Sequence, residues 1–297
     1  MSQPLIAPLP AGSCLGVIAP AGPPRAGLLD QVAPAIERLG FRAKLFPGCA
    51  GPAHLGHLAA SDAQRLADLH AALADPEVDA VLALRGGYGC IRLLPALDRG
   101  LIAGAAKPLI GYSDISSLHA VWTQLGLPAW HAPMPASDWL HPGGWADAER
   151  LAAELQRGLW PGDRQRAPGH HALNRSGIAR GRLLGGNLAV LASCLGTPAM
   201  PALAGNIVFI EDVAEDPYRI DRYLAQLRAA GQLDGVAGLL LGSFTEADSS
   251  DAVLADHLHR IGCPLLAGWP AGHGQPNHPL PLGQKVELDA GLGELRW

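Results

Sequence analysis

Short apolar runs alternate with amphipathic segments along the first half of the chain, and a turn rich in glycine or proline follows several of the runs. The runs predicted to be strands are "CLGVIAPAG", "RAKLF", "VDAVLALRGGYG" and "KPLIG". The segments with apolar residues at helical spacing are "LLDQVAPAIERLG", "SDAQRLADLHAALADP", "CIRLLPALD" and "ISSLHAVWTQLG". Strand, turn and helix in regular alternation predict an α/β fold, with a parallel sheet and helices on both of its faces.

The pattern changes near residue 160. The stretch Gly158–Gly177 is rich in glycine, proline and charge and has no hydrophobic period. Beyond it we predict strands at "GIARGRLLGG", "NIVFIED" and "VAGLLLGSF", helices at "NLAVLASCLG", "DPYRIDRYLAQLRAAG" and "SDAVLADHLHRIG", and a hairpin at "QKVELDAGLGELRW". The sequence therefore predicts an N-terminal domain over 1–160, a linker over 161–177 and a smaller C-terminal β/α domain over 178–297.

Composition narrows the class of protein. Apolar residues make up 48% of the 297 residues and charged residues 16%, which suits folded domains rather than disorder. A net charge of −5 argues against nucleic acid or an anionic membrane as partner. The five cysteines form no Cys-x-x-Cys pair, and the N-terminus has neither a basic segment nor an unbroken apolar one. We therefore expect a cytoplasmic protein with reduced thiols.

Ser113 stands between a predicted strand and a predicted helix in "KPLIGYSDISSLHAVW". Serine and aspartate at such a junction commonly cap the helix. A sharp strand-to-helix turn can instead hold a serine outward as a nucleophile, provided that a histidine and an acid lie nearby. Because Ile115 replaces the second glycine of the Gly-x-Ser-x-Gly pattern, this stretch alone favours the cap.

The glycines of "RGGYGC" let backbone N–H groups approach a ligand closely, and they precede a predicted helix. The loop has neither the lysine of a P-loop nor the spacing of a dinucleotide fingerprint, so nucleotide binding is only weakly supported. It can donate an N–H to an oxyanion. Cys90, at the start of that helix, is an alternative nucleophile if the helix lowers the pKa of its thiol.

Two later segments offer a base and an acid. His273 lies between glycines in "LLAGWPAGHGQPNH", an accessible place for an imidazole, whereas the nearby His278 precedes a proline. Glu211 ends the apolar run of "NIVFIED", at the sheet edge where catalytic groups collect. Asp212 should point to the opposite side of the strand. We therefore favour Glu211 over Asp212 as the acid that orients a histidine.

Five blocks in order along the chain resemble the LD-carboxypeptidase family, serine peptidase family S66. They are "RGGYGCIRLLPALD", "KPLIGYSDISSLHAVW", "GRLLGGNLAVLASCLGTP", "NIVFIEDVAEDPYRIDRYLAQL" and "GHGQPNHPLPLG". The resemblance runs from "GVIAPAG" near the start to "LPLG" near the end. It implies a flavodoxin-like N-terminal sheet joined to a smaller C-terminal β/α domain.

The resemblance also implies a catalytic triad. Ser113 in "GYSD" would be the nucleophile, Glu211 in "FIED" the orienting acid and His273 in "AGH" the general base. The backbone N–H of Asp114 and that of Gly87 would bind the oxyanion, with Gly86 as the alternative donor and a substrate contact.

Substrate and partners follow from the same resemblance. The family releases D-alanine from the L-centre of diaminopimelate in muropeptide tetrapeptides during cytoplasmic cell-wall recycling, and it needs no metal or organic cofactor. Gly186 and Asn187 in "LLGGN" would line the substrate site, although Asn187 is about as well explained as a helix cap. The resemblance further implies a homodimer.

Two other functions stay open at this point. One branch of the family, similar to microcin C immunity proteins, cleaves peptidyl or aminoacyl nucleotide conjugates with the same triad. A non-catalytic protein that binds a peptide or carboxylate through the glycine loops would fit two domains equally well. An intact Ser, Glu and His set distinguishes an enzyme from such a binding protein.

Overall fold

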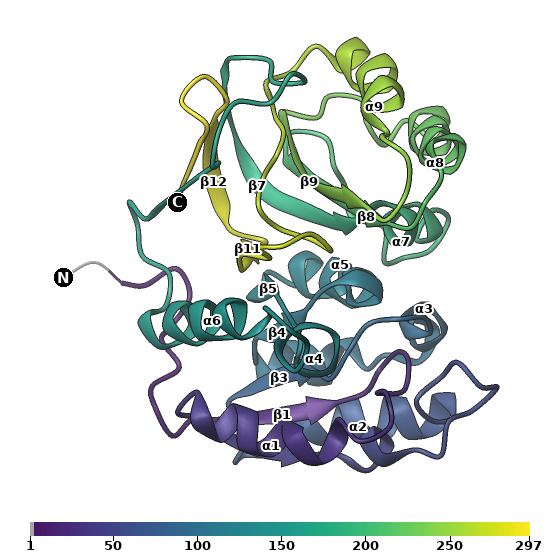
Figure 1. The fold of residues 1–297 in the computed structure, drawn as a ribbon, viewed down its shortest axis with the longest axis vertical. Helices are drawn as coiled ribbons and strands as arrows, with labels where there is room; N and C mark the ends of the chain where they lie inside the picture. The colour runs from purple at the N-terminus through teal and green to yellow at the C-terminus, as the bar shows by residue number, and fades with distance from the viewer. Residues whose placement is uncertain (1–2) are drawn as a thin grey trace.

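Two β-sheets organise residues 3–297 of the computed structural model, one in each of two stacked domains (Figure 1). The first sheet has six strands in the order β11-β5-β4-β3-β1-β2. The second has seven strands in the order β10-β9-β8-β7-β12-β13-β6. The prediction of an α/β fold with two domains is confirmed.

The first sheet is parallel from β1 to β5, with helices on both faces as predicted. Its parallel strands are β1 (Cys14–Ile18), β2 (Arg42–Leu45), β3 (Ala80–Ala83), β4 (Leu109–Gly111) and β5 (Ala129–His131). The helices of this part are α1 (Leu29–Arg38), η1 (Pro47–Ala50), α2 (Asp62–Ala74), α3 (Cys90–Leu93), η2 (Leu94–Ala96), α4 (Arg99–Ala105), η3 (Ser113–Ile115), α5 (Ser116–Gln124), η4 (Pro135–Trp139) and α6 (Trp145–Arg157). Strand order reverses between β1 and β3, so the crevice for a ligand lies at their carboxyl ends.

The second sheet is parallel from β7 to β10 and continues as an antiparallel edge, in which β12 and β13 form the predicted hairpin. Its strands are β6 (Arg164–Arg166), β7 (Ile178–Asn187), β8 (Ile207–Val213), β9 (Gly238–Thr245), β10 (Leu265–Leu266), β12 (Lys285–Asp289) and β13 (Glu294–Arg296). The helices are α7 (Leu188–Ser193), α8 (Pro217–Ala229), α9 (Asp251–Leu258) and η5 (His259–Ile261). Helices α7, α8 and α9 gather on one side of this sheet (Figure 1).

The division into domains over 1–160 and 178–297 with a linker over 161–177 stays a prediction. Two strands pair across these predicted boundaries. Strand β6 lies inside the segment expected to be a linker, and it pairs with β13 at the edge of the second sheet. Strand β11 (Leu280–Leu282) lies in the C-terminal segment but pairs antiparallel with β5 of the first sheet. The C-terminal segment therefore supplies an edge strand to the N-terminal sheet.

The alternation of side chains along β8 explains how the domains join. Ile207 and Phe209 belong to the hydrophobic core that also contains the N-terminal sheet. Val208 and Ile210 point the other way, into a second core formed with α7, α8 and α9. Because both faces of β8 are covered, its first four residues, 207–210, form an unbroken apolar run. One face of the C-terminal sheet is thus packed on the N-terminal domain.

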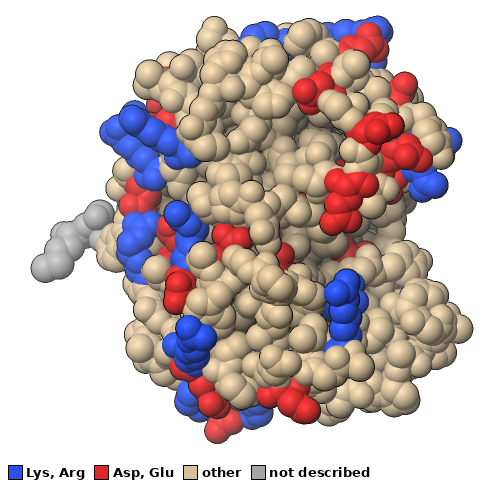
Figure 2. Space-filling view, in the orientation of Figure 1, with Lys and Arg blue, Asp and Glu red and all other residues tan. Residues whose placement is uncertain are grey.

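Charge is mixed on the face of the molecule that Figure 2 shows. On the face shown in Figure 2, acidic and basic side chains are distributed over both domains and form no broad basic surface. Within residues 3–297, no helix combines the length and the apolar composition needed to cross a bilayer.

Candidate active site

Ser113 occupies a strained turn at the end of β4. The chain leaves the strand extended at Tyr112, and then takes φ of +64° at Ser113 before η3 and α5 begin. A non-glycine residue in this left-handed region costs about 1–2 kcal/mol. Neither η3 nor α5 has a side-chain cap hydrogen bond at its start, so Ser113 is not the helix cap that its position alone suggested. The strain is typical of a turn that presents a nucleophile.

Asp114 connects this turn to the glycine loop after β3. Its carboxylate accepts a hydrogen bond from the backbone N–H of Cys90 at 2.8 Å, so it caps α3 rather than α5. Cys90 is fully buried, and burial together with the adjacent Asp114 carboxylate raises the pKa of its thiol well above the usual value. The alternative of a Cys90 thiolate nucleophile is therefore wrong.

The glycine loop lies directly against the serine turn. A Cβ atom added to Gly86 would lie 2.7 Å from Cβ of Ser113 and 2.8 Å from its Oγ, so only glycine fits there. The carbonyl of Gly86 accepts a hydrogen bond from the N–H of Gly22, in the loop after β1, at 3.1 Å. Gly87 has φ of +119°, which an L side chain rarely adopts. The assignment of the N–H groups of Gly87 and Asp114 to an oxyanion site stays a prediction.

This contact makes Gly86→Ala a sharp test of the turn. The new methyl group must displace the Ser113 side chain or the loop, and a misplacement of about 1 Å can lower turnover by about 100-fold. We expect a folded protein with that loss. Gly104→Ala is the matched control, because a Cβ added to Gly104 in α4 meets no atom within 4 Å. Equal turnover in the two variants, measured with the same substrate, would contradict the close packing of Gly86 on Ser113.

Glu211 and His273 form a buried pair in the C-terminal domain. His273 Nδ1 lies 2.7 Å from Glu211 Oε2, which also accepts the backbone N–H of His273 at 3.2 Å. Because Nδ1–H donates to the carboxylate, Nε2 is left as the basic nitrogen. In this geometry Glu211, and not Asp212, contacts the histidine, and the role of Glu211 as orienting acid stays a prediction. His278 donates its backbone N–H to the carbonyl of Pro270 instead.

The alternation along β8 accounts for the choice between the two acids. Glu211 is fully buried on the side of Phe209, toward the N-terminal domain. Asp212 serves the start of α7, where Oδ2 accepts the N–H of Ala189 at 3.0 Å and Oδ1 accepts the side-chain amide of Asn187 at 2.8 Å. Asp212 is therefore a helix-capping residue.

Opposite charges set the ionisation of the pair. Burial alone would raise the pKa of Glu211, but His273 and His131 lower it to about 2. Burial alone would lower the pKa of His273, but the surrounding carboxylates, above all Glu211 and then Asp138 and Asp212, raise it above its usual value. Glu211 is thus a carboxylate at neutral pH, and the imidazole beside it is a stronger base than a free histidine.

Ser113 and His273 line the same pocket of about 310 Å³ between the domains. Gly86 and Gly87 also line it, whereas Gly186 and Asn187 do not. Within residues 3–297 there is no hydrogen bond between the Ser113 hydroxyl and the imidazole. Such contacts are often long in the absence of substrate and tighten when it binds. The pocket therefore brings the serine turn, the glycine loop and the histidine together from two domains.

Gly186 and Asn187 require a correction. Asn187 is buried and caps α7, since its Oδ1 accepts the N–H of Val190 at 3.1 Å. Its backbone N–H donates to the Ser116 hydroxyl at 3.0 Å, and a Cβ on Gly186 would collide with the same hydroxyl. With their polar groups used inside the protein, these residues hold β7 against α5 rather than line the pocket. The prediction of a substrate wall here was wrong, and the helix cap was the right alternative for Asn187.

Several polar residues of the pocket were missed from the sequence. Arg85 stands immediately before the quoted glycines and donates to the carbonyl of Pro23 at 2.8 Å, and Arg25 also lines the pocket. Asp138 accepts the Tyr112 hydroxyl at 2.8 Å, and burial raises the pKa of its carboxyl to about 6. Arg85 could have been noticed as the cation of "RGGYG". No pattern in the neighbouring sequence marks Asp138 as a pocket residue, because its position depends on a π-helical turn at Pro135–Trp139.

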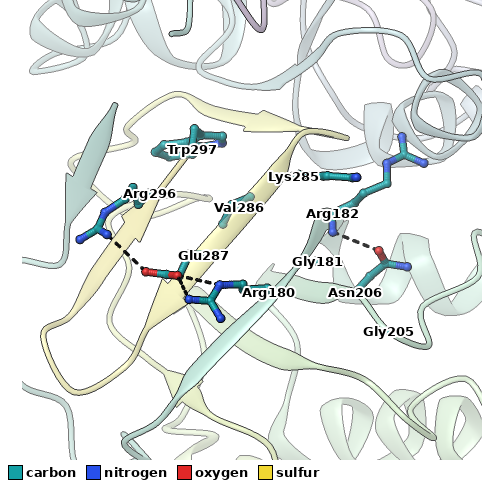
Figure 3. A pocket seen from close by; sticks show the side chains of 10 residues that line it. All are labelled: Arg180, Gly181, Arg182, Gly205, Asn206, Lys285, Val286, Glu287, Arg296 and Trp297. Carbon is teal, nitrogen blue, oxygen red and sulfur yellow. Dashed lines mark hydrogen bonds and ion pairs between the residues drawn. The ribbon is translucent and has the colours of Figure 1, made fainter. Parts of the chain in front are cut away.

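A larger cavity of about 660 Å³ lies elsewhere, on β7, β12 and β13 (Figure 3). Most of its charged side chains form ion pairs or hydrogen bonds with other residues of the chain. Arg180 and Arg296 pair with Glu287, at 2.5 and 3.5 Å, and Arg182 donates to the carbonyl of Gly283 at 2.9 Å. No member of the predicted triad lines this cavity. Its size alone does not make it the active site.

Two α/β domains that share a pocket with a serine on a strained turn and a glutamate-bound histidine have the architecture of a serine hydrolase. Family models agree with that class. The description "LD-carboxypeptidase N-terminal domain" matches residues 15–132, and "LD-carboxypeptidase C-terminal domain" matches residues 180–288. The chain belongs to the LD-carboxypeptidase family, peptidase family S66.

Individual relatives support the same family. The chain is 38% identical to a probable murein peptide carboxypeptidase of Bacillus subtilis, over 94% of this chain and 89% of the relative. The crystal structure of a muramoyltetrapeptide carboxypeptidase from Oxalobacter formigenes matches with a TM-score of 0.85 and 29% identity, over 95% of this chain and 97% of that chain. The microcin C7 self-immunity protein MccF shares the fold, with a TM-score of 0.88 at 23% identity over 99% and 98% of the two chains.

Proposed function

We propose that this protein is a serine LD-carboxypeptidase that releases the terminal D-alanine of muropeptide tetrapeptides during peptidoglycan recycling. The bond cleaved would join the L-centre of diaminopimelate to D-alanine. The observation that carries the proposal is the 2.7 Å contact between His273 and Glu211 at a pocket that Ser113 also lines. The family and the name of the Bacillus subtilis relative support the substrate class.

The chemistry proceeds in two acyl-transfer steps. Ser113 Oγ attacks the carbonyl carbon of the L-centre while its proton passes to His273 Nε2, which then protonates the leaving amine of D-alanine. Glu211 stabilises the imidazolium that forms between these transfers. Water next loses a proton to His273 and attacks the acyl-enzyme, which frees the tripeptide and restores Ser113. The N–H groups of Gly87 and Asp114 would bind the oxyanion in both steps.

Two guanidinium groups of the pocket suit the recognition of a chain terminus. Any carboxypeptidase substrate ends in a carboxylate, and Arg25 and Arg85 lie on the side of the pocket formed by the loops after β1 and β3. A guanidinium group binds a carboxylate through two parallel hydrogen bonds. The pocket is therefore suited to a peptide that ends one residue beyond the bond cleaved.

Release of free D-alanine tests the proposal. We expect the purified protein to release D-alanine from a tetrapeptide that ends in L-centre–D-alanine, at the same rate with and without a chelator. Aminoacyl sulfamoyl nucleotides supplied in parallel test the microcin-like alternative. Turnover of the nucleotide conjugate alone would favour that alternative, and binding of the tetrapeptide without turnover of either substrate would favour a non-catalytic binding protein.

The cellular setting belongs to the same proposal. Recycling of muropeptides takes place in the cytoplasm, and the five cysteines are buried and unpaired, as expected in a reducing compartment. We propose a cytoplasmic homodimer with no nucleic-acid or membrane partner. Light scattering of the purified protein gives the mass directly, and a mass near the monomer's 30.9 kDa would contradict the dimer.

A further inference from the structure

One oxygen of Glu211 lacks a hydrogen bond among residues 3–297. Oε2 binds His273, but Oε1 is buried without a partner. His131 Nε2 lies 3.7 Å from Oε1, and both side chains are fully buried. An ionised oxygen left unpaired in a region of low dielectric is costly, so a donor is expected at this position.

His131 is suited to be that donor. It is the last residue of β5, in the first sheet, and the edge strand β11 holds it in register through Leu280. Its ring packs edge-on against Phe209, with ring centroids 4.9 Å apart, and against Tyr112 at 5.4 Å. Neither ring nitrogen has a hydrogen-bond partner among the described residues. The ring is therefore fixed in place with an N–H free to donate.

The gap between the two groups is small. An N–H···O hydrogen bond is usually about 2.9–3.0 Å long, so an approach of less than about 1 Å closes the distance from 3.7 Å. We propose that His131 is a positioning residue that donates Nε2–H to Oε1 of Glu211 and so fixes the carboxylate for His273. This inference rests on the proposed function, in which Glu211 orients the general base.

The assignment gives the domain interface a role in the reaction. Glu211 and His273 come from the C-terminal domain, whereas His131 and Ser113 come from strands of the N-terminal sheet. The carboxylate would then be held from both sides, and the acid and the nucleophile would be aligned only while the domains are docked. An ordinary core histidine offers a contrast. His119 is also buried without a hydrogen-bond partner, but no ion pair joins it to Glu211 among residues 3–297.

Two variants separate positioning from packing. His131→Phe keeps a ring in the core but removes the donor, whereas His131→Gln places an amide N–H near the position of Nε2. We expect the phenylalanine variant to lose about 10- to 100-fold in kcat with little change in KM, as for the loss of one hydrogen bond to a buried charge. The glutamine variant should have a kcat close to that of the wild type. Trp130→Phe, at the neighbouring position of β5, controls for altered packing of the strand.

The proposal is overturned if His131→Phe keeps kcat within about threefold of wild type, or if Trp130→Phe lowers kcat as much. A wild type that releases no D-alanine would instead overturn the proposed function. Nitrogen NMR of the histidines in the wild-type protein tests the hydrogen bond without any measurement of turnover. The signals of His131, identified by their loss in His131→Gln, should show a protonated Nε2. A neutral ring with the proton on Nδ1 alone excludes the donor role.

Discussion

Ser113→Ala is expected to lower kcat for release of D-alanine by at least about 10⁴-fold while the fold and the binding of the tetrapeptide are retained. The reason is chemical, because alanine has no hydroxyl to form the acyl-enzyme. The Glu211–His273 pair remains in place in this variant, since neither residue has a hydrogen bond to Ser113. Single-turnover release of D-alanine, together with calorimetric binding of the peptide, measures the two expectations separately.

The backbone at Ser113 supplies the matched variant. Alanine keeps the strain of φ +64°, whereas glycine adopts this conformation readily. Ser113→Gly should therefore be as inactive as Ser113→Ala but more stable than it by about 1 kcal/mol in free energy of unfolding. Denaturant titration of the two variants checks the difference. Full turnover in either variant would rule out Ser113 as the nucleophile.

Much of the fold could be predicted because local sequence and global structure agree. Parallel strands such as β1 and β3 carry unbroken apolar runs, and Gly86 marks a turn where an added Cβ would collide with Ser113. Glu211 could be favoured over Asp212 from its place at a strand end. The structure adds the reason, since only the Glu211 side of β8 faces the N-terminal domain.

The features that could not be predicted depend on contacts distant in sequence. Strand β11 has three residues and a central proline, and only pairing with β5 gives it a defined conformation. β5 is equally short, so His131 gave no signal of its place beside Glu211. Asn187 was ambiguous because a capping amide and a ligand-binding amide have the same local sequence. The packing of β7 on α5 decides between them.

Glu211→Gln is expected to change both the rate and its dependence on pH. Neutral His273 is the base, so kcat/KM of the wild type should rise with pH through the pKa of His273, which lies above 6.5 because of the Glu211 carboxylate. Glutamine removes that charge, and burial then lowers the pKa of the imidazole against only the weaker, more distant charges of Asp138 and Asp212. The rise in kcat/KM should move to lower pH. Its plateau should fall by about 10³- to 10⁴-fold, because an amide no longer holds the ring with Nε2 free or stabilises the imidazolium.

Asp212→Asn is the control that makes this pH profile informative. It removes a carboxylate from the adjacent position of β8, where the side chain caps α7 and does not bind His273. Asparagine keeps an acceptor for the N–H of Ala189, so we expect a pH profile close to that of the wild type and a plateau within about tenfold of it. A shift in both variants would mean that His273 responds to the overall negative charge of the region. A shift in Glu211→Gln alone would tie the basicity of His273 to the 2.7 Å contact itself, since that contact is the feature the two carboxylates do not share.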